Sequence, residues 1–280
     1  MFDKIEKIGN TTIQHGKNNN RIYLMKLDKN DYPGVIPKIN SLAKKKKYTK
    51  VFTKIPKWAV EGFKKDGYIQ EGRIPKFYNG KIDAYFYSKF LDKNRAEIKP
   101  EVKNIIEKHI KLALSKKRAY LNIQFNRDLK LKLLDENDVI KLAKLYKSVF
   151  KSYPFPIFNP DFLENTMNNH VVYFGVYDKN KLIAAASSEM YKDGGNAEMT
   201  DFATLPDYRG NNLSLNLLRE MEAEMRLRKM KTLYTIARSH SAGMNITFSK
   251  LNYSYSGTLI NNTDIAGKIE SMNIWYKNLI

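Results

Sequence analysis

Two distant stretches of the sequence resemble each other, and this likeness limits the folds open to the chain. In each stretch a β-like run is followed by a short helical segment that ends at a tyrosine, with a glycine four residues after that tyrosine. The matching pairs are Lys50–Ile55 with Thr232–Ile236, Phe63–Tyr68 with Phe248–Tyr253, and Gly72 with Gly257. An internal repeat of this kind predicts a strand–helix–strand–strand unit that occurs twice. Coincidental likeness is the alternative.

The positive charge is concentrated in the first part of the chain. Of the formal net charge of +20 for 280 residues, residues 1–125 (29 basic, 12 acidic) carry +17 and residues 126–280 (20 basic, 17 acidic) carry +3. This difference predicts a basic first unit over 1–125 and a nearly neutral second unit over 126–280. A basic surface can bind nucleic acid. However, only 10 of the 49 basic residues are arginine, which forms the best forked contacts with phosphate, so composition bias is the preferred explanation.

Several classes of protein are excluded by what the sequence lacks. It contains no cysteine, which excludes a disulfide scaffold, a thiolate metal site and a cysteine nucleophile. No apolar run approaches the roughly 20 residues that a membrane span needs. The segment MFDKIEKIGN lacks the apolar core of a signal peptide. We therefore expect a cytoplasmic protein with no metal and no membrane contact.

The second unit alternates predicted strands and helices. From Leu129 onward the order is β-α-α-β-β-β-α-β-α-β-β, with a long helix from about Asn212 to Arg228. Its last three strands are expected over Thr232–Ala237, Tyr255–Ile260 and Ile274–Leu279. This order predicts an α/β (α+β) fold in which helices flank a mixed central sheet.

The most informative run is Ala197–Arg228, which contains a strand, a proline turn, a loop of small residues and the long helix. The loop, Arg209–Ser214 (RGNNLS), precedes the helix directly. Free backbone N–H groups and the positive end of a helix suit a pyrophosphate at this position. Arg209 adds a cation. An ordinary capped helix is the alternative interpretation.

This run resembles the fingerprint of the GNAT superfamily of acetyl-CoA-dependent N-acetyltransferases, Arg/Gln-x-x-Gly-x-Gly/Ala after a strand and a proline turn. Arg209-x-x-Asn212-x-Ser214 fills that frame with two departures, because Asn212 and Ser214 stand at the glycine and glycine/alanine positions. Asparagine is the non-glycine residue that best tolerates left-handed backbone angles. The family's late Lys-x-Gly-Phe is similar to Lys250-Leu251-Asn252-Tyr253. The resemblance implies a GNAT fold over Leu129–Ile280.

Longer runs resemble the β-lysine N6-acetyltransferases, a GNAT family that pairs with a lysine 2,3-aminomutase to turn lysine into a compatible solute, N-epsilon-acetyl-β-lysine. The similar runs are IQHGKNNNRIYLMKL, AEMTDFATLPDYRG, TLYTIARSHSAGMNITFSKL and GTLINNT…ESMNIWYK. They span nearly the whole chain, so the first unit is interpreted as a smaller half-GNAT-like domain. The resemblance implies direct acetyl transfer from acetyl-CoA to a primary amine, by a monomer or homodimer with no nucleic-acid partner.

The resemblance also implies where acetyl-CoA binds. The thioester and pantetheine would lie along a strand that is splayed from Thr232–Ala237, at Phe202, Ala203 and Thr204. The diphosphate would bind the loop residues Arg209, Gly210, Asn211, Asn212, Leu213 and Ser214. Ser241 aligns with a family asparagine that contacts pantetheine, and Asn245, one helical turn later, is a candidate for the same role.

Charged side chains near the central strand are candidates for the acceptor site. An ammonium group must lose a proton before it attacks, and Glu198 is the preferred base, with Asp201 next. Strand alternation predicts that these two point to opposite faces, so that only one meets the amine. Glu189 is a candidate for binding the substrate's positive charge and Arg238 for binding its carboxylate. Purely structural or solvent-facing roles are the alternatives.

The general acid is the least defined role. The tyrosine that many family members use aligns with Phe248, which cannot donate a proton. Tyr253 and Tyr234 are the neighbouring substitutes, and a thiol of pKa about 8.5 can also leave without an acid. Two other functions stay open at this point: a GNAT enzyme acting on lysine or a polyamine, and a nucleic-acid-associated binding protein.

Overall fold

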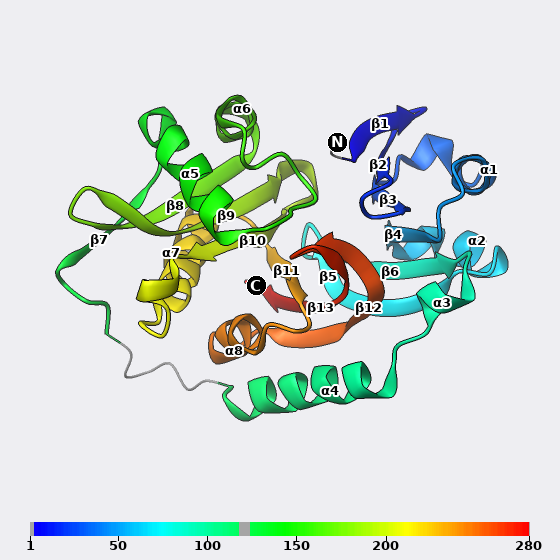
Figure 1. Cartoon of the computed structure of the whole chain (residues 1–280). Coiled ribbons are helices and arrows are strands. Elements are labelled where there is room, and N and C mark those ends of the chain that lie inside the picture. Colours follow the sequence, from blue (N-terminus) through cyan, green and yellow to red (C-terminus); the bar gives the residue numbers. More distant parts are fainter. Residues whose placement is uncertain (1–2, 118–123, 280) are drawn as a thin grey trace.

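The computed structural model describes residues 3–117 and 124–279, which form two β-sheets side by side (Figure 1). The first sheet has the order β1-β2-β3-β4-β6-β5, and only the central pair β3–β4 is parallel. Its strands are β1 (Lys4–Ile8), β2 (Thr11–Gly16), β3 (Arg21–Lys26), β4 (Lys50–Pro56), β5 (Ile69–Tyr78) and β6 (Ile82–Phe90).

The second sheet repeats this plan and adds one strand. Its order is β12-β13-β11-β10-β9-β8-β7, and only the central pair β10–β11 is parallel. Its strands are β7 (Leu129–Leu133), β8 (Val171–Asp178), β9 (Lys181–Tyr191), β10 (Asn196–Thr204), β11 (Thr232–Arg238), β12 (Ser254–Ile265) and β13 (Lys268–Asn278). Strands β8 to β13 therefore correspond in order and direction to β1 to β6.

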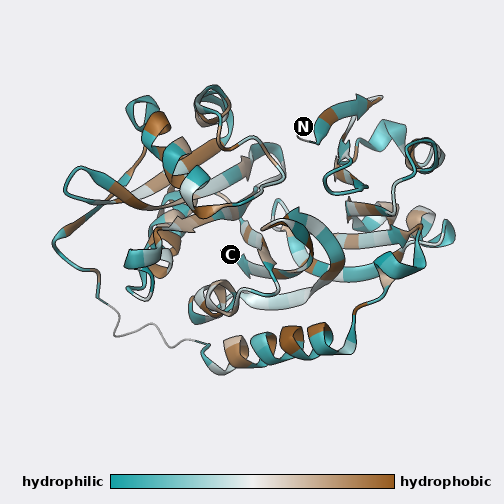
Figure 2. Ribbon diagram, viewed as in Figure 1, coloured by the Kyte–Doolittle hydropathy of each residue, from teal (hydrophilic) through white to brown (hydrophobic). Residues whose placement is uncertain are grey.

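Helices cover the sheets, and their apolar faces form separate cores. Helices α1 (Val35–Lys45) and α2 (Val60–Lys65) pack on one face of the first sheet. In the second half, α7 (Leu213–Leu227) and α8 (Ala242–Lys250) pack on one face and α5 (Val139–Val149) and α6 (Pro160–Asn169) on the other. Figure 2 shows hydrophobic residues along β8 and β9, between these helix layers.

The remaining helices follow the first sheet. A short α3 (Lys93–Ala96) leads into α4 (Pro100–Ser115), which lies along α8 before the chain enters the second half (Figure 1). Within the described residues, no helix is long and apolar enough to cross a membrane.

A shared core joins the two halves. Phe52, Phe77 and Phe86 of the first sheet pack with Tyr234 and Ile274 of the second, and the Phe77 and Tyr234 ring centroids are 5.0 Å apart. The backbones of β5 and β12 also approach closely where the repeated glycines meet. A Cβ on Gly257 would lie 2.0 Å from the carbonyl oxygen of Glu71 and 3.1 Å from the Cα of Gly72. Glycine at position 257 is therefore required by this contact, and its counterpart Gly72 is one of the residues that it faces.

The repeat is larger than the sequence predicts. The strand–helix–strand–strand unit is present in both halves as β4 to β6 and β11 to β13. The match extends over β1, β2 and β3 to six strands, and of these β1 and β2 are absent from the prediction. The expected strands at Tyr255–Ile260 and Ile274–Leu279 are the ends of one long hairpin, β12–β13, that turns at Ala266-Gly267. The polar run after Ile260 hides this strand because asparagine and aspartate have low β-propensity.

Candidate active site

A cavity of about 840 Å³ lies between the two halves, and both contribute to its walls. Side chains from β3 and β4 of the first sheet line one part of it. Residues of β9, β10 and β11 line another part, and the loop before α7 and the start of α8 line a third. The sequence predicts site residues in the second half only. The cavity-lining residues of the first half follow from the tertiary structure alone.

The cavity opens where β10 and β11 separate. These parallel strands pair over three positions, from Asn196–Thr232 to Glu198–Tyr234, and the pairing then ends. Beyond that point Phe202 and Thr204 line the cavity. The side chain of Ala203 is instead buried in the core beneath α5 and α6. The separation exposes a strand edge whose backbone groups are not used by the neighbouring strand.

The prediction that Glu198 and Asp201 point to opposite faces is wrong. The pairing of β10 with β9 shifts register between Thr200 and Ala203, and Asp201 has φ = +55°. Such a bulge interrupts strand alternation. As a result Glu198, Thr200, Asp201 and Phe202 all line the same cavity.

Glu198 lies in an unusual electrostatic environment. Burial, together with the neighbouring carboxylates Glu189 and Asp201, raises its pKa to about 7, against the lowering effects of Lys54 and of a hydrogen bond from Tyr234. Glu189 is the direct cross-strand partner of Glu198, and burial raises its pKa as well. A cationic amine bound between these two adjacent carboxyl groups would favour their ionised forms, so the pair suits a cationic amine.

Asp201 is more fully engaged than Glu198. Its two carboxylate oxygens accept hydrogen bonds from the hydroxyls of Tyr153 and Ser187. Burial raises its pKa, while these hydrogen bonds act in the opposite direction. A carboxylate held on both oxygens is better suited to a fixed charge than to a mobile proton acceptor.

Lys54 is the main functional residue that the sequence analysis missed. It comes from β4 of the first half, and its Nζ donates to the hydroxyl of Tyr234 at 2.7 Å. It also lies 4.9 Å from the centre of the Tyr234 ring. Lys54 lies in the first strand of the first copy of the repeat, but no local pattern could show that it acts on Glu198, because the two residues lie in different sheets.

The loop before α7 has the backbone shape that an anion site needs. Asn212 occupies the N-cap with φ = +55° and makes no side-chain capping hydrogen bond, and Gly210 has φ = +84°. Left-handed backbone at Asn212 is what the frame Arg209-x-x-Asn212 requires of a residue in the glycine position. The cavity is lined here by Arg209, Gly210, Asn212, Leu213 and Ser214, whereas Asn211 lies outside its lining.

The two predicted pantetheine contacts differ. Ser241 lines the cavity and caps α8 by accepting from the backbone N–H of Met244. Asn245 is completely buried and does not line it. Its amide donates to the carbonyls of Arg238 and Ser241, and its oxygen accepts from Asn273 and Trp275. Every hydrogen-bonding position of Asn245 is thus used within the fold.

Two further predicted residues are engaged elsewhere. The guanidinium of Arg238 forms a forked ion pair with Glu270, with N–O distances of 3.0 and 2.9 Å, so its carboxylate-binding edge is occupied. Tyr253 is completely buried against Phe248 and does not line the cavity. Tyr234 does line it. The described residues contain no cluster of His, Asp or Glu side chains suited to a metal ion.

Comparison with known proteins places this geometry in context. Residues 139–246 match the model of the acetyltransferase (GNAT) family. The chain is 42% identical to the β-lysine N(6)-acetyltransferase of Methanococcus maripaludis, over 99% of both chains. It is 33% identical to the N-acetyltransferase YodP of Bacillus subtilis, over 100% of both chains. It is 30% identical to the β-lysine N(6)-acetyltransferase of Methanosarcina mazei, over 86% of this chain and 95% of that one.

Proposed function

The chain belongs to the GNAT family of acetyltransferases, in the same group as the β-lysine N(6)-acetyltransferases, and on that premise we propose that it acetylates the terminal amine of β-lysine. The observation that carries this proposal is the position of Glu198. It faces Glu189 in a cavity that opens where β10 and β11 separate, beside the N-terminus of α7. A cationic amine and an anionic diphosphate would each find opposite charge there.

The cavity fits acetyl-CoA, the acetyl donor of this family. Acetyl-CoA supplies the acetyl group as a thioester. The first helical N–H groups of α7, on Leu213 and Ser214, have no acceptor within the helix and would bind the diphosphate. Arg209, exposed at this loop, adds a positive charge. Ser241 lines the route between this loop and the acids of β10.

Glu198 is the proposed general base. With a pKa of about 7, roughly half of this carboxyl group is ionised at neutral pH and can take a proton from the substrate's ammonium group. Glu189 and Asp201 supply further negative charge that favours binding of the cationic form. The ammonium group would thus be held first and deprotonated at the same place.

Tyr234 is better positioned than Tyr253 to protonate the leaving thiolate. Its hydroxyl lies in the cavity next to Glu198, and burial together with that carboxylate raises its pKa well above the usual value. It therefore stays protonated at neutral pH, and Lys54 Nζ, which donates to the same hydroxyl, would stabilise the phenolate that proton donation to the thiolate leaves. Tyr253 is fully buried in the core beside Phe248 and has no such access.

The central experiment is an acetyl-transfer assay that measures thiol release from acetyl-CoA with β-lysine, lysine and spermidine as acceptors. We expect the highest kcat/KM for β-lysine and a product acetylated at N6, identified by NMR. Equal or faster turnover of lysine or spermidine would refute the substrate assignment. Absence of acetyl-CoA turnover with any amine would refute the reaction itself.

The diphosphate position has its own test. Arg209→Glu places a negative charge at the loop and should raise the KM for acetyl-CoA at least tenfold with little change in the KM for β-lysine. Arg228→Glu is the matched control, because Arg228 lies beyond the other end of α7 and pairs with Glu224 on the surface. An unchanged acetyl-CoA KM in Arg209→Glu would exclude this diphosphate site.

The proposed substrate also implies a partner reaction. β-Lysine differs from lysine in the position of one amine, so a lysine 2,3-aminomutase in the same compartment must supply it. We place both enzymes in the cytoplasm, where acetyl-CoA and lysine are available, and expect a monomer or a homodimer. A gene for the aminomutase next to this one would support the pairing.

A further inference from the structure

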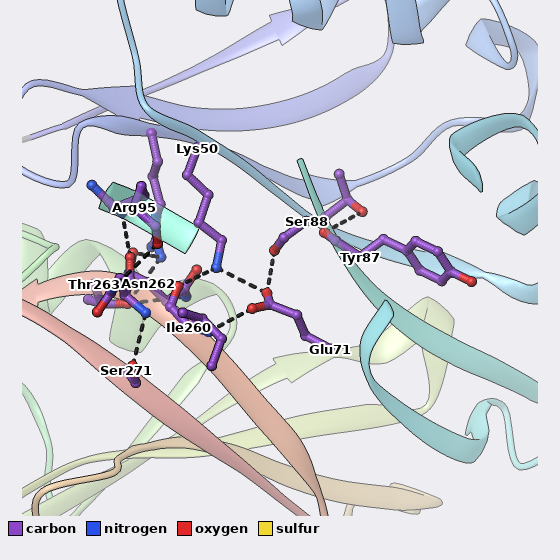
Figure 3. A network of polar contacts seen from close by, with 12 residues as sticks. Lys50, Glu71, Tyr87, Ser88, Arg95, Ile260, Asn262, Thr263 and Ser271 are labelled. Atoms are coloured by element: carbon purple, nitrogen blue, oxygen red, sulfur yellow. Dashed lines mark hydrogen bonds and ion pairs between the residues drawn. The ribbon is translucent and has the colours of Figure 1, made fainter. Parts of the chain in front are cut away.

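Three consecutive backbone carbonyls of β12 each accept a hydrogen bond from a buried cation of the first half. Lys50 Nζ donates to the carbonyl of Ile260 at 2.7 Å, Arg95 Nε to that of Asn261, and Arg21 Nη1 to that of Asn262. Figure 3 shows this network at the edge of β12. A register shift between Leu259 and Thr263 turns these carbonyls away from β13 and toward the cations.

The buried cations of this network are not all paired with a carboxylate. Glu71, itself 3.0 Å from Lys50, is the carboxylate that pairs with them within the described residues. Among the described residues, no carboxylate lies within 4 Å of Arg21, although the exposed fraction of Arg21 is only 4%. Burial and the neighbouring Arg95 lower the pKa of Arg21 to about 10, while the charges of Asp3 and Glu71, which lie beyond ion-pair distance, act in the opposite direction. A buried guanidinium with no anion in direct contact is costly unless a ligand provides one.

Arg21 also differs from Arg95 in its position. Arg21 lines the cavity, whereas Arg95 does not. Its Nη1 is occupied by Asn262 and Thr263, while its Nε is buried with no acceptor among the described residues. The remaining edge of the guanidinium, Nε with Nη2, is the one that forms a forked pair with a carboxylate.

Next to this unused donor is an unused acceptor. The side chain of Asn262 is 1% exposed and lines the same cavity, and its Oδ1 has no donor in the described structure. Arg21 would bind an anionic group and the Asn262 oxygen a cationic group. An amino acid carries both, as its carboxylate and the amine next to it. A polyamine could satisfy only one of them.

We propose that Arg21 and Asn262 bind the head group of the acceptor, with the carboxylate on Arg21 and the second amine on Asn262 Oδ1. This inference rests on the proposed function and names the residues that select a diamino acid. It gives the first half a direct role in substrate recognition, and it assigns the carboxylate to Arg21 in place of Arg238, whose fork is filled by Glu270.

The positions on β3 suit an extended diamino acid that lies along this strand. Arg21 and Tyr23 project from the same face of β3, roughly 6.6 Å apart along the strand. Tyr23 lies within electrostatic range of Glu198, which contributes to raising its pKa. An extended β-lysine spans about 7–8 Å between its terminal nitrogen and its carboxylate carbon. A β-lysine whose carboxylate lies at Arg21 would therefore extend along β3 past Tyr23, the residue on which Glu198 acts electrostatically.

The first experiment removes the carboxylate from the substrate and the charge from the site. kcat/KM is measured for β-lysine and for 1,4-diaminopentane, which is β-lysine without its carboxylate. The wild-type protein should prefer β-lysine by about 100-fold. Arg21→Gln should lose most of that preference through a higher KM for β-lysine, while its kcat/KM for 1,4-diaminopentane changes less than about threefold. Arg21→Lys, which keeps the charge without the fork, should lie between.

Arg95→Gln is the matched control. It removes a buried arginine that also donates to β12, but from a position outside the cavity. We expect both substrates to respond equally to Arg95→Gln. Thermal unfolding of each variant shows whether a loss is structural. A parallel loss for both substrates in Arg21→Gln, or a wild type that uses the diamine as well as β-lysine, would overturn the inference.

The second experiment tests the amine subsite. 6-Aminohexanoate has the terminal amine and the carboxylate of β-lysine but lacks its second amine. Asn262→Leu keeps the size of the side chain and removes the acceptor, so the preference for β-lysine over 6-aminohexanoate should fall by about tenfold. An unchanged preference would remove Asn262 from the site.

Failure of the proposed function gives a different pattern. In that case the wild type prefers an amine other than β-lysine, and the same comparison is made between that amine and its decarboxylated form. A carboxylate preference that depends on Arg21 would keep the inference. A wild type that prefers an amine without a carboxylate would refute it.

Discussion

The two halves of the molecule share one arrangement of strands and use it differently. Strands β1 to β6 repeat the order and directions of β8 to β13, and in each sheet the single parallel pair lies at the centre. The register makes individual positions comparable, because Tyr23 pairs with Phe52 as Glu198 pairs with Tyr234. The position of the proposed base is therefore a tyrosine in the first half.

The loops before the corresponding helices, α7 and α1, also differ, and only the loop before α7 suits a diphosphate. In the second half, Gly210 and Asn212 adopt left-handed angles at the N-terminus of α7. In the first half, Asp31 lies before α1, where its carboxylate accepts from the backbone of Asn10 and Thr11 at 2.8 and 2.7 Å. A fixed anion at this turn would repel a diphosphate. We infer that one copy keeps the chemistry and the other provides a wall of the acceptor cavity.

The largest expected effect tests whether catalysis belongs to the second half alone. Glu198→Gln removes the base and should lower kcat/KM at pH 7 by about 10²–10³-fold, measured by thiol release. The corresponding change in the first half, Tyr23→Phe, keeps the ring and should change kcat/KM less than about threefold. If Glu198→Gln keeps full activity and an unshifted pH profile, Glu198 is not the base.

The contact between the halves gives the next largest effect. Gly257→Ala places a Cβ 2.0 Å from the backbone oxygen of Glu71 and should lower the free energy of unfolding by about 1–3 kcal/mol, measured in urea. Gly243→Ala, in α8, is the control, because a Cβ there meets nothing within 4 Å. It should stabilise the protein by about 0.4–1 kcal/mol. Equal stability of the two variants would contradict a tight junction between β5 and β12.

The loop before α7 is tested with substitutions at Asn212 that differ in their tolerance of a left-handed backbone angle. Asn212→Ala forces alanine into φ = +55° and should cost about 1 kcal/mol of stability, together with a several-fold rise in the KM for acetyl-CoA. Asn212→Gly accepts the same angle and should leave the KM close to that of the wild type. An identical KM for the two variants would mean that the left-handed angle does not serve the binding site.

The smallest effect measures how the first half adjusts the second. Lys54 favours the ionised form of Glu198 and so lowers its pKa from the value that burial would otherwise produce. Because the base is active when ionised, kcat/KM should rise with pH through about 7 in the wild type. Lys54→Met should move this rise to higher pH by up to about one unit. A rise at unchanged or lower pH would show that Lys54 does not act on Glu198.

Local sequence was sufficient for most elements and for one side of the site. The pattern of Ala197–Arg228 predicts β10, the turn and α7, and the asparagine at the glycine position of the frame predicts the left-handed angle of Asn212. The bulge at Asp201 was not predictable, since its cause lies in the pairing of β10 with β9. The roles of Arg238 and Asn245 were also out of reach, because their partners, Glu270 and Asn273, are distant in sequence.

The sequence by itself determined the repeated unit, the strand and helix order of the second half, and the loop that suits a diphosphate. These features depend on residue spacing and backbone preference, which act over a few residues. Only the tertiary structure decided which charges meet. It brought Lys54 to Tyr234 and Glu198, and it left Arg21 buried beside Asn262 with no carboxylate within 4 Å among the residues that the structure describes. Electrostatic partners act through space, and the fold alone sets those distances.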